Sequence, residues 1–206
     1  FLYKDGENAK RAVELAESMP SMAISRDFLL PVVTDGDRCY KETQSKVFNL
    51  VQFLEVAIGS MNVKLDSGKY AYTSEMQAAL RDKQIAFLHL MFENGDFGFF
   101  DTHLHYIHKD QAMYYAKVGN NEKAIEHLRH AAEHALRFVK HMCKEPYTSL
   151  LFRNMPAGSF ATTGTNNDAA ELLNSMRQPV FDNIRDTEAF KSIRDELSAY
   201  AGKWDV

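Results

Sequence analysis

The fold is decided by residues 104–138, which read LHYIHKDQAMYYAKVGNNEKAIEHLRHAAEHALRF. A helical pattern runs to Val118, breaks at Gly119-Asn120-Asn121 and resumes at Glu122 with alanines along one side. Small residues let two helices approach closely, and glycine permits the tight turn between them. The stretch therefore predicts two antiparallel helices in close contact, and the alanines expected at that contact are Ala124, Ala131, Ala132 and Ala135.

This helix pair resembles one repeat of a tetratricopeptide (TPR) array, a family of stacked helix-turn-helix units. Gly119 occupies the turn position of that pattern, and Ala124 and Ala131 occupy close-contact positions. The first half departs from the pattern, with His108 at the usual Trp and Ala112 at the usual Gly. The resemblance implies an all-α fold of antiparallel helix pairs stacked as a right-handed superhelix, whose concave wall recognises other molecules.

The remaining sequence favours the same all-α class, because no run of alternating apolar and polar residues predicts a sheet. Capping boxes are expected at Ser74 with Gln77 and at Asp168 with Glu171, and Thr187 is expected to cap the last helix. Helices are predicted at about 7–18, 38–61, 73–93, 99–118, 122–142, 168–177 and 187–201.

Length and composition predict one helical domain over residues 1–206. A chain of this length with 45% hydrophobic residues can bury a full core. Cys39 and Cys143 lack the spacing of a metal site, and no signal peptide or membrane span is apparent, so a cytoplasmic protein without membrane contact is expected. The formal charge of −4 disfavours nucleic-acid binding by these residues themselves. Because the sequence starts at Phe1 and residues 6–19 resemble the second helix of a pair, we expect a fragment of a longer protein.

Two interruptions separate the predicted helices. Residues 94–98, NGDFG, lie among aromatic residues and predict a packed corner. Residues 144–167 become rich in Gly, Ser, Thr and Asn after Pro156, which is typical of a loop. The sequence leaves open whether the part at 157–167 closes over a ligand.

All eight histidines lie within residues 89–141. His130, Glu133 and His134 match the H-x-x-E-H pattern of inverzincins, although no further carboxylate ligand is apparent. His130 and His134 are therefore candidate ligands of an adventitious or regulatory metal ion, and the alternative is that they are boundary residues between core and solvent. The stripe that contains them comprises His127, His130, His134 and His141.

Three further histidines, His103, His105 and His108, are placed where they could approach this stripe across the helix pair. His108 occupies a large packing position, so it is expected to be a hydrogen-bonded core residue. The sequence contains no nucleophile elbow, P-loop or dinucleotide fingerprint. We therefore expect no catalytic residues and no cofactor.

The predicted helix at 41–60 is unusually apolar and predicts cover on more than one side. A central place in the superhelix and a dimer interface both account for this. Asn49 and Gln52 are candidate ligand contacts, because amide side chains can pair with a peptide backbone. The narrow polar stripe of this helix comprises Ser45, Asn49, Gln52 and Glu55.

Several motifs outside the repeat point to a more specific family. These are residues 93–99, ENGDFGF; residues 147–151, YTSLL; and residues 181–186, FDNIRD, followed by Phe190. With the repeat, they resemble the C-terminal TPR-like half of XRE-type helix-turn-helix transcriptional regulators from Firmicutes, over roughly residues 40–200. The resemblance implies an upstream DNA-reading domain that is absent from this sequence. It also implies a helical half that dimerises and, in peptide-pheromone receptors, binds a signalling peptide on its inner wall.

The resemblance also implies that the predicted helix at 104–118 contacts a ligand. The inner-wall side of this helix comprises Tyr106, Lys109, Asp110, Met113 and Lys117. The first hypothesis is a ligand-sensing and oligomerisation domain of a DNA-binding regulator, with a peptide or protein effector, a homodimeric state and DNA contact only through the upstream domain. The second is a stand-alone TPR scaffold for protein binding. The third is a zinc-dependent hydrolase built on His130, Glu133 and His134.

Overall fold

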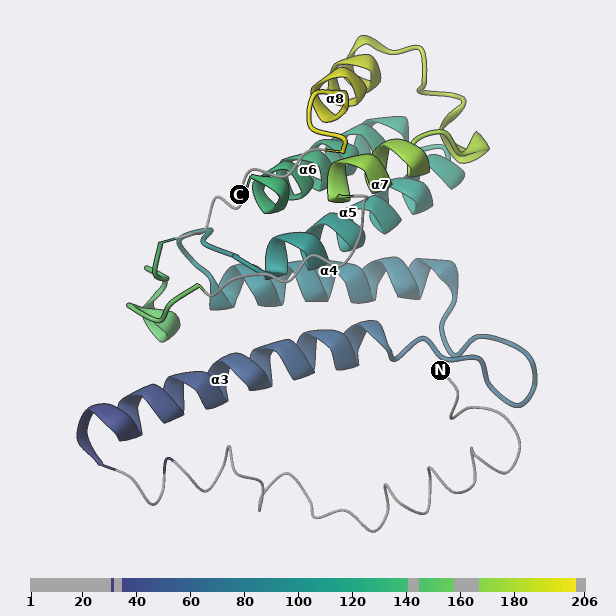
Figure 1. Cartoon of the computed structure of the whole chain (residues 1–206). Coiled ribbons are helices and arrows are strands. Elements are labelled where there is room, and N and C mark those ends of the chain that lie inside the picture. Colours follow the sequence, from purple (N-terminus) through teal and green to yellow (C-terminus); the bar gives the residue numbers. More distant parts are fainter. Residues whose placement is uncertain (1–30, 32–34, 141–144, 158–166, 203–206) are drawn as a thin grey trace. The chain divides into compact units, whose positions relative to one another are not determined.

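The computed structural model describes residue 31 and residues 35–140, 145–157 and 167–202. Within these residues it contains helices and no β-strand, which confirms the all-α class. The helix predicted at 7–18 lies outside the described residues. The helices are α3 (Gly36–Gly59), α4 (Ser74–Met91), α5 (Phe100–Lys117), α6 (Asn121–Val139), α7 (Asp168–Ser175) and α8 (Glu188–Ser198), with short 3-10 turns η2 (Leu150–Phe152) and η3 (Pro179–Phe181) (Figure 1).

The chain divides into two compact units, Phe1–Leu50 and Val51–Val206, and the boundary falls within α3. In the described part of the first unit, the Cys39 thiol donates to the Pro31 carbonyl at 3.3 Å. One helical turn along, the Gln44 amide donates to the Tyr40 hydroxyl at 2.9 Å. These local contacts hold the first turns of α3.

The predicted helix pair at 104–138 is present as α5 and α6 (Figure 1). Gly119 lies between them with φ +78°, a left-handed conformation in which glycine carries no steric penalty. Asn120 then caps α6, because its side chain accepts a hydrogen bond from the Lys123 amide at 3.2 Å. Together these two residues reverse the chain within three positions.

The core of the second unit forms where α6 packs against α5, α7 and α8. The four alanines expected at the helix contact are all buried, and two alanines of α5 face them. Larger side chains from α7 and its C-cap, from η3 and from α8 complete this core because the alanines leave room for them. These larger residues are Leu172, Met176, Phe181, Phe190, Ile193 and Leu197.

The predicted corner at 94–98 is a packed aromatic cluster. Phe92 is fully buried, and its ring centroid lies 5.1 Å from that of Phe100 and 4.8 Å from that of Phe152. Asp96 holds the η2 segment against this corner by accepting hydrogen bonds from the backbone N–H groups of Thr148 and Ser149, at 2.5 and 3.0 Å. The YTSLL motif therefore has a structural role in this corner.

The FDNIRD motif has a comparable structural role between α7 and α8. Phe181 and Ile184 are buried in the core. The Arg185 guanidinium donates to the carbonyls of Met176 and Arg177 at 3.2 and 3.1 Å, which satisfies acceptors at the end of α7. Thr187 caps α8 as predicted, with its hydroxyl accepting from the Phe190 amide at 3.3 Å.

Two predicted helix caps were wrong by one residue. The cap of α4 is Thr73 and not Ser74, because the Thr73 hydroxyl accepts from the Met76 amide at 3.2 Å. The cap of α7 is Asn167 and not Asp168, because the Asn167 side chain accepts from the Ala170 amide at 3.0 Å. In both cases the neighbouring side chain has the same capping chemistry.

The C-terminal half of α3 departs from its predicted environment. Glu55, placed in the polar stripe by the sequence, is only 4% exposed and accepts from Gln84 at 3.0 Å and pairs with His103 at 2.6 Å. Conversely Phe53 is 60% exposed, so the described residues leave this side of α3 uncovered. None of the described helices combines the length and apolarity that crossing a membrane would require.

Candidate functional site

Two adjoining cavities follow the surface between α4 and α5, and we call them together the α4–α5 groove. The larger has a volume of about 410 Å³ and the smaller about 170 Å³. Both are lined by Gln77 and Arg81 from α4 and by Asp110 from α5. The larger cavity extends to Val180 of η3, and the smaller extends to Ile58 at the end of α3.

An ion pair stands where the two cavities meet. Arg81 Nη2 lies 2.5 Å from Asp110 Oδ2, and Arg81 Nε donates to the same oxygen at 3.1 Å. Both side chains remain partly exposed. The pair thus offers a guanidinium and a carboxylate to a molecule lying along the groove.

The amide side chain of Gln111 provides a further polar group in the groove. The Gln111 Nε2 group donates to the Ala78 carbonyl at 3.0 Å and to Asp82 Oδ1 at 2.5 Å. Its Oε1 atom is buried and accepts no hydrogen bond from the described residues. A buried acceptor without a partner is unfavourable, so it marks a point where an added donor would be stabilised.

Four of the residues predicted from the sequence to contact a ligand line this groove. Tyr106 lines the smaller cavity, Met113 and Lys117 line the larger one, and Asp110 lines both. They come together because residues three and four apart share one face of a helix. The sequence did not identify Arg81, whose role depends on a partner 29 positions away.

The other predicted ligand contacts lie elsewhere. Lys109 Nζ pairs with Glu171 Oε1 at 2.9 Å and is not among the residues lining the groove. Asn49 is exposed and belongs to the first unit, and Gln52 is half-buried on α3 without lining either cavity. Their roles in binding stay predictions.

Glu171 joins α7 to α5 through two basic groups. His105 Nε2 lies 3.0 Å from its Oε2, and His105 itself is fully buried. Burial acts to raise the pKa of the Glu171 carboxyl, but hydrogen bonds from His105 and Lys109 outweigh it and lower the pKa to about 2. Burial raises the pKa of the neighbouring Asp168. This cluster is a structural link between helices.

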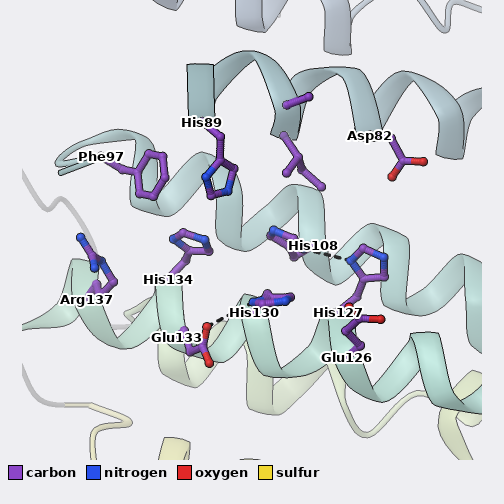
Figure 2. A pocket seen from close by; sticks show the side chains of 12 residues that line it. Asp82, His89, Phe97, His108, Glu126, His127, His130, Glu133, His134 and Arg137 are labelled. Atoms are coloured by element: carbon purple, nitrogen blue, oxygen red, sulfur yellow. Dashed lines mark hydrogen bonds and ion pairs between the residues drawn. The ribbon is translucent and has the colours of Figure 1, made fainter. Parts of the chain in front are cut away.

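A third cavity, of about 550 Å³, is lined by α4, α5 and α6, and we call it the histidine cavity (Figure 2). Figure 2 shows His89 entering from α4 and His108 from α5, while the other three imidazoles project from α6. Of the three histidines predicted to approach the α6 stripe, His108 does so, whereas His103 pairs with Glu55 and His105 with Glu171. The five imidazoles that line this cavity are His89, His108, His127, His130 and His134.

His108 lies at the centre of this group of rings. Its Nδ1 atom is 3.0 Å from Nδ1 of His127, so one of these two nitrogens carries a proton that it donates to the other. The His108 ring centroid lies 5.1 Å from that of His130 and 5.6 Å from that of His134. His108 is also buried, as predicted for a hydrogen-bonded core residue.

The electrostatics of the cavity favour the neutral form of three of its imidazoles, those of His89, His108 and His127. Burial is the main cause that lowers the pKa of His108, to about 2, and the neighbouring imidazoles lower it further. Burial also lowers the pKa of His89 and that of His127. Neutral imidazole nitrogens can act as acceptors or as metal ligands at neutral pH.

The two predicted metal ligands both line the histidine cavity but have other partners. His130 Nδ1 lies 3.2 Å from Glu133 Oε2 on the exposed side of α6. His134 Nδ1 lies 2.8 Å from the buried Asp101 carboxylate, which Arg137 also contacts at 3.2 Å. In the described part of the chain, no three His, Cys, Asp or Glu side chains are already arranged to hold a metal ion.

Sequence reasoning missed two features of the histidine cavity. His89 was not linked to the α6 stripe, because it belongs to a different helix and no periodicity relates the two. Asp82 lines the same cavity from α4 and was likewise not identified. Both lie on one face of α4, so the joint pattern of α4 and α6 could have indicated a shared cavity.

Comparisons of the chain with protein-family models, with curated proteins and with solved structures found no match.

Proposed function

We propose that this chain is the effector-sensing and oligomerisation part of a DNA-binding transcriptional regulator, and that it binds a peptide in the α4–α5 groove. The observation that supports this proposal is the position of Tyr106, Asp110, Met113 and Lys117 along the groove. The repeat pattern of the sequence predicts all four as ligand contacts.

The chemistry of the groove suits an extended peptide better than a small neutral molecule. A peptide presents an N–H donor and a carbonyl acceptor at each residue, and the buried Gln111 Oε1 can accept one such donor. Arg81 and Lys117 can bind a carboxylate, while Asp110 can bind an ammonium group. Met113, with its flexible side chain, supplies adaptable apolar contact area.

The cavities also have a size that accords with this proposal. The larger cavity, of about 410 Å³, lies within the range of about 300 to 1,000 Å³ that is typical of ligand sites. The adjoining smaller cavity extends it past the Arg81–Asp110 pair toward α3. A peptide of several residues would therefore contact α3, α4, α5 and η3 at once.

Binding across several helices supplies a mechanism for sensing. An effector that contacts one arrangement of these helices better than another shifts their equilibrium, and such couplings are typically about 1 to 3 kcal/mol. In a dimeric regulator this shift would reposition the attached DNA-binding domains. The mechanism contains no chemical step.

The experiment for this proposal is a selection of random linear octapeptides against the purified chain. Enriched peptides should bind the wild type and lose at least about tenfold affinity to Arg81→Ala or Lys117→Ala, since a charged hydrogen bond contributes roughly 1.5 to 3 kcal/mol. Lys64→Ala, an exposed change away from the groove, serves as the control. Peptides that bind all four proteins equally would place the binding surface elsewhere.

A stand-alone protein-binding scaffold would use the same groove, so binding alone does not separate the two functions. The native gene product separates them through its intact mass and N-terminal sequence. A regulator requires an additional segment of about 60 to 110 residues with a basic helix-turn-helix pattern. A native chain that starts within a few residues of Phe1 would instead favour the scaffold.

A further inference from the structure

We propose that the histidine cavity binds one divalent transition-metal ion, such as Zn²⁺, Co²⁺ or Ni²⁺, through Nδ1 of His108, Nδ1 of His127 and the imidazole of His130. The site bridges α5 and α6 on the side of α5 away from the α4–α5 groove. It rests on the geometry of these imidazoles and is independent of peptide binding.

The two Nδ1 atoms of His108 and His127 already have the separation of neighbouring ligands. They lie 3.0 Å apart. Two nitrogens bound to one ion at about 2.1 Å, with an angle between 90° and 109°, stand roughly 3.0 to 3.4 Å apart. The distance between these nitrogens therefore suits two ligands of one ion, which would replace the hydrogen bond once each ring turns so that its Nδ1 lone pair points at the ion.

His130 is positioned to complete the site. It lies three residues after His127 on α6, so the two imidazoles share one face of the helix. Its ring centroid is 5.1 Å from that of His108, and its hydrogen bond to Glu133 is long, at 3.2 Å, and exposed. Rotation of this ring costs little, whereas His134 is held by the buried Asp101.

The proton balance of binding follows from the hydrogen bond between His108 and His127. Whichever ring donates the hydrogen bond moves its proton from Nδ1 to Nε2 through solvent, and both Nδ1 lone pairs then face the ion. Among the described residues, the hydrogen bond given for these two rings joins their Nδ1 atoms, so their Nε2 atoms can take up that proton. Glu126 and Asp82 line the same cavity and supply negative charge near the ion.

A purely structural role explains this arrangement less well. Of the five imidazoles around this cavity, those of His108 and His134 are buried, at 5% and 7% exposure, and burial of polar rings is unfavourable. Apolar residues at the same positions would fill the space without that cost. Imidazole is a preferred ligand of Zn, Ni and Cu ions, so metal binding explains why these imidazoles are clustered.

The experiment uses the full chain without an affinity tag, after treatment with a chelator. Isothermal titration with ZnCl₂, CoCl₂ or NiCl₂ should give one ion per chain at low micromolar Kd or tighter. His127→Gln and His130→Gln should each weaken binding at least about tenfold, since even outer-shell changes cost 10-fold to 100-fold. His103→Gln is the matched control, because it removes an imidazole outside the cavity and retains a donor for Glu55.

Electron paramagnetic resonance of the Cu²⁺-loaded chain gives a second readout that does not depend on affinity. The wild type should show hyperfine coupling to three nitrogens, and His127→Gln should show one nitrogen fewer. Absence of stoichiometric binding for all of these ions would overturn the proposal. So would an adventitious ion only, recognised by equal binding to the wild type, His127→Gln and His130→Gln.

Discussion

At the scale of single residues, Glu171 shows how one carboxylate can connect two helices. It accepts hydrogen bonds from His105 and Lys109 of α5, and its pKa falls to about 2 from an unperturbed 4.5. Because the pKa of this carboxyl is lower in the folded chain than in the unfolded chain, its ionised form stabilises the fold above pH 4.5. That stabilisation is lost as the pH falls from 4.5 toward 2.

Glu171→Gln should therefore destabilise the chain near neutral pH and change its response to acid. We expect a loss of about 1 to 2 kcal/mol at pH 7 after allowing for partial solvent screening, and a smaller difference from wild type at pH 3. Urea unfolding at the two pH values measures this. Glu188→Gln, at an exposed pair, is the control, and an equal deficit at pH 7 and pH 3 would contradict the account.

Gly98 allows a test of how tightly Tyr147 packs against the corner before α5. Its φ of +57° is left-handed, and an added Cβ would collide with the buried Tyr147 hydroxyl. Gly95 has a φ of +71° but nothing within 4 Å of an added Cβ. Replacing either glycine with alanine is unfavourable because alanine disfavours the left-handed backbone conformation. Only Gly98→Ala also creates a steric clash.

Gly98→Ala should consequently lower the free energy of unfolding by about 1 to 3 kcal/mol more than Gly95→Ala does. Thermal and urea unfolding of both variants provide the comparison. Equal stability of the two would show that Tyr147 moves away without cost.

At the scale of elements, Asp96 anchors η2 to the corner before α5. Its carboxylate accepts from the backbone and hydroxyl groups of Thr148 and Ser149. Burial acts to raise its pKa, but these hydrogen bonds, the Ser149 hydroxyl foremost, lower it overall. The anchored segment carries the exposed Leu150.

Asp96→Ala should release this segment while the helices stay folded. We expect amide hydrogen exchange at residues 147–152 to accelerate and global stability to fall by about 1 to 3 kcal/mol. Asp66→Ala, at an exposed position outside the corner, should change neither quantity. Unchanged exchange at 147–152 in Asp96→Ala would show that the aromatic cluster alone holds the segment.

The elements also show what a sequence can and cannot predict. Helix positions follow from local periodicity, and the bounds of α5 and α6 agree with prediction to within a few residues. Caps were displaced where adjacent residues have the same chemistry, as with Thr73 and Ser74. The burial of Glu55 depends on Gln84, 29 positions away, and no local pattern carries that information.

The residues of the candidate sites also differ in whether the sequence could predict them. The groove face of α5 could be predicted because it repeats at helical spacing on one element. Arg81 and His89 could not, because each comes from α4 and contributes only after the helices pack. Sites built from several helices therefore require the tertiary structure.

At the scale of the whole molecule, the exposed apolar residues of α3 bear on the predicted homodimer. Phe53, Leu54 and Val56 are each between 46% and 60% exposed in the single chain. A dimer that covers this face requires apolar contact there. Phe53→Glu should then shift the molar mass in light scattering from dimer to monomer, whereas Glu42→Gln should not. A wild type that is monomeric at high concentration would contradict the prediction.

We propose that an effector peptide binds in the α4–α5 groove and not in the histidine cavity on the other side of α5. The most direct measurement is a titration of one selected, fluorescently labelled octapeptide against wild type, Arg81→Ala and His127→Gln, followed by anisotropy. Arg81→Ala should weaken binding at least about tenfold, while His127→Gln should bind like the wild type. Wild-type affinity in Arg81→Ala, or a loss confined to His127→Gln, would contradict it.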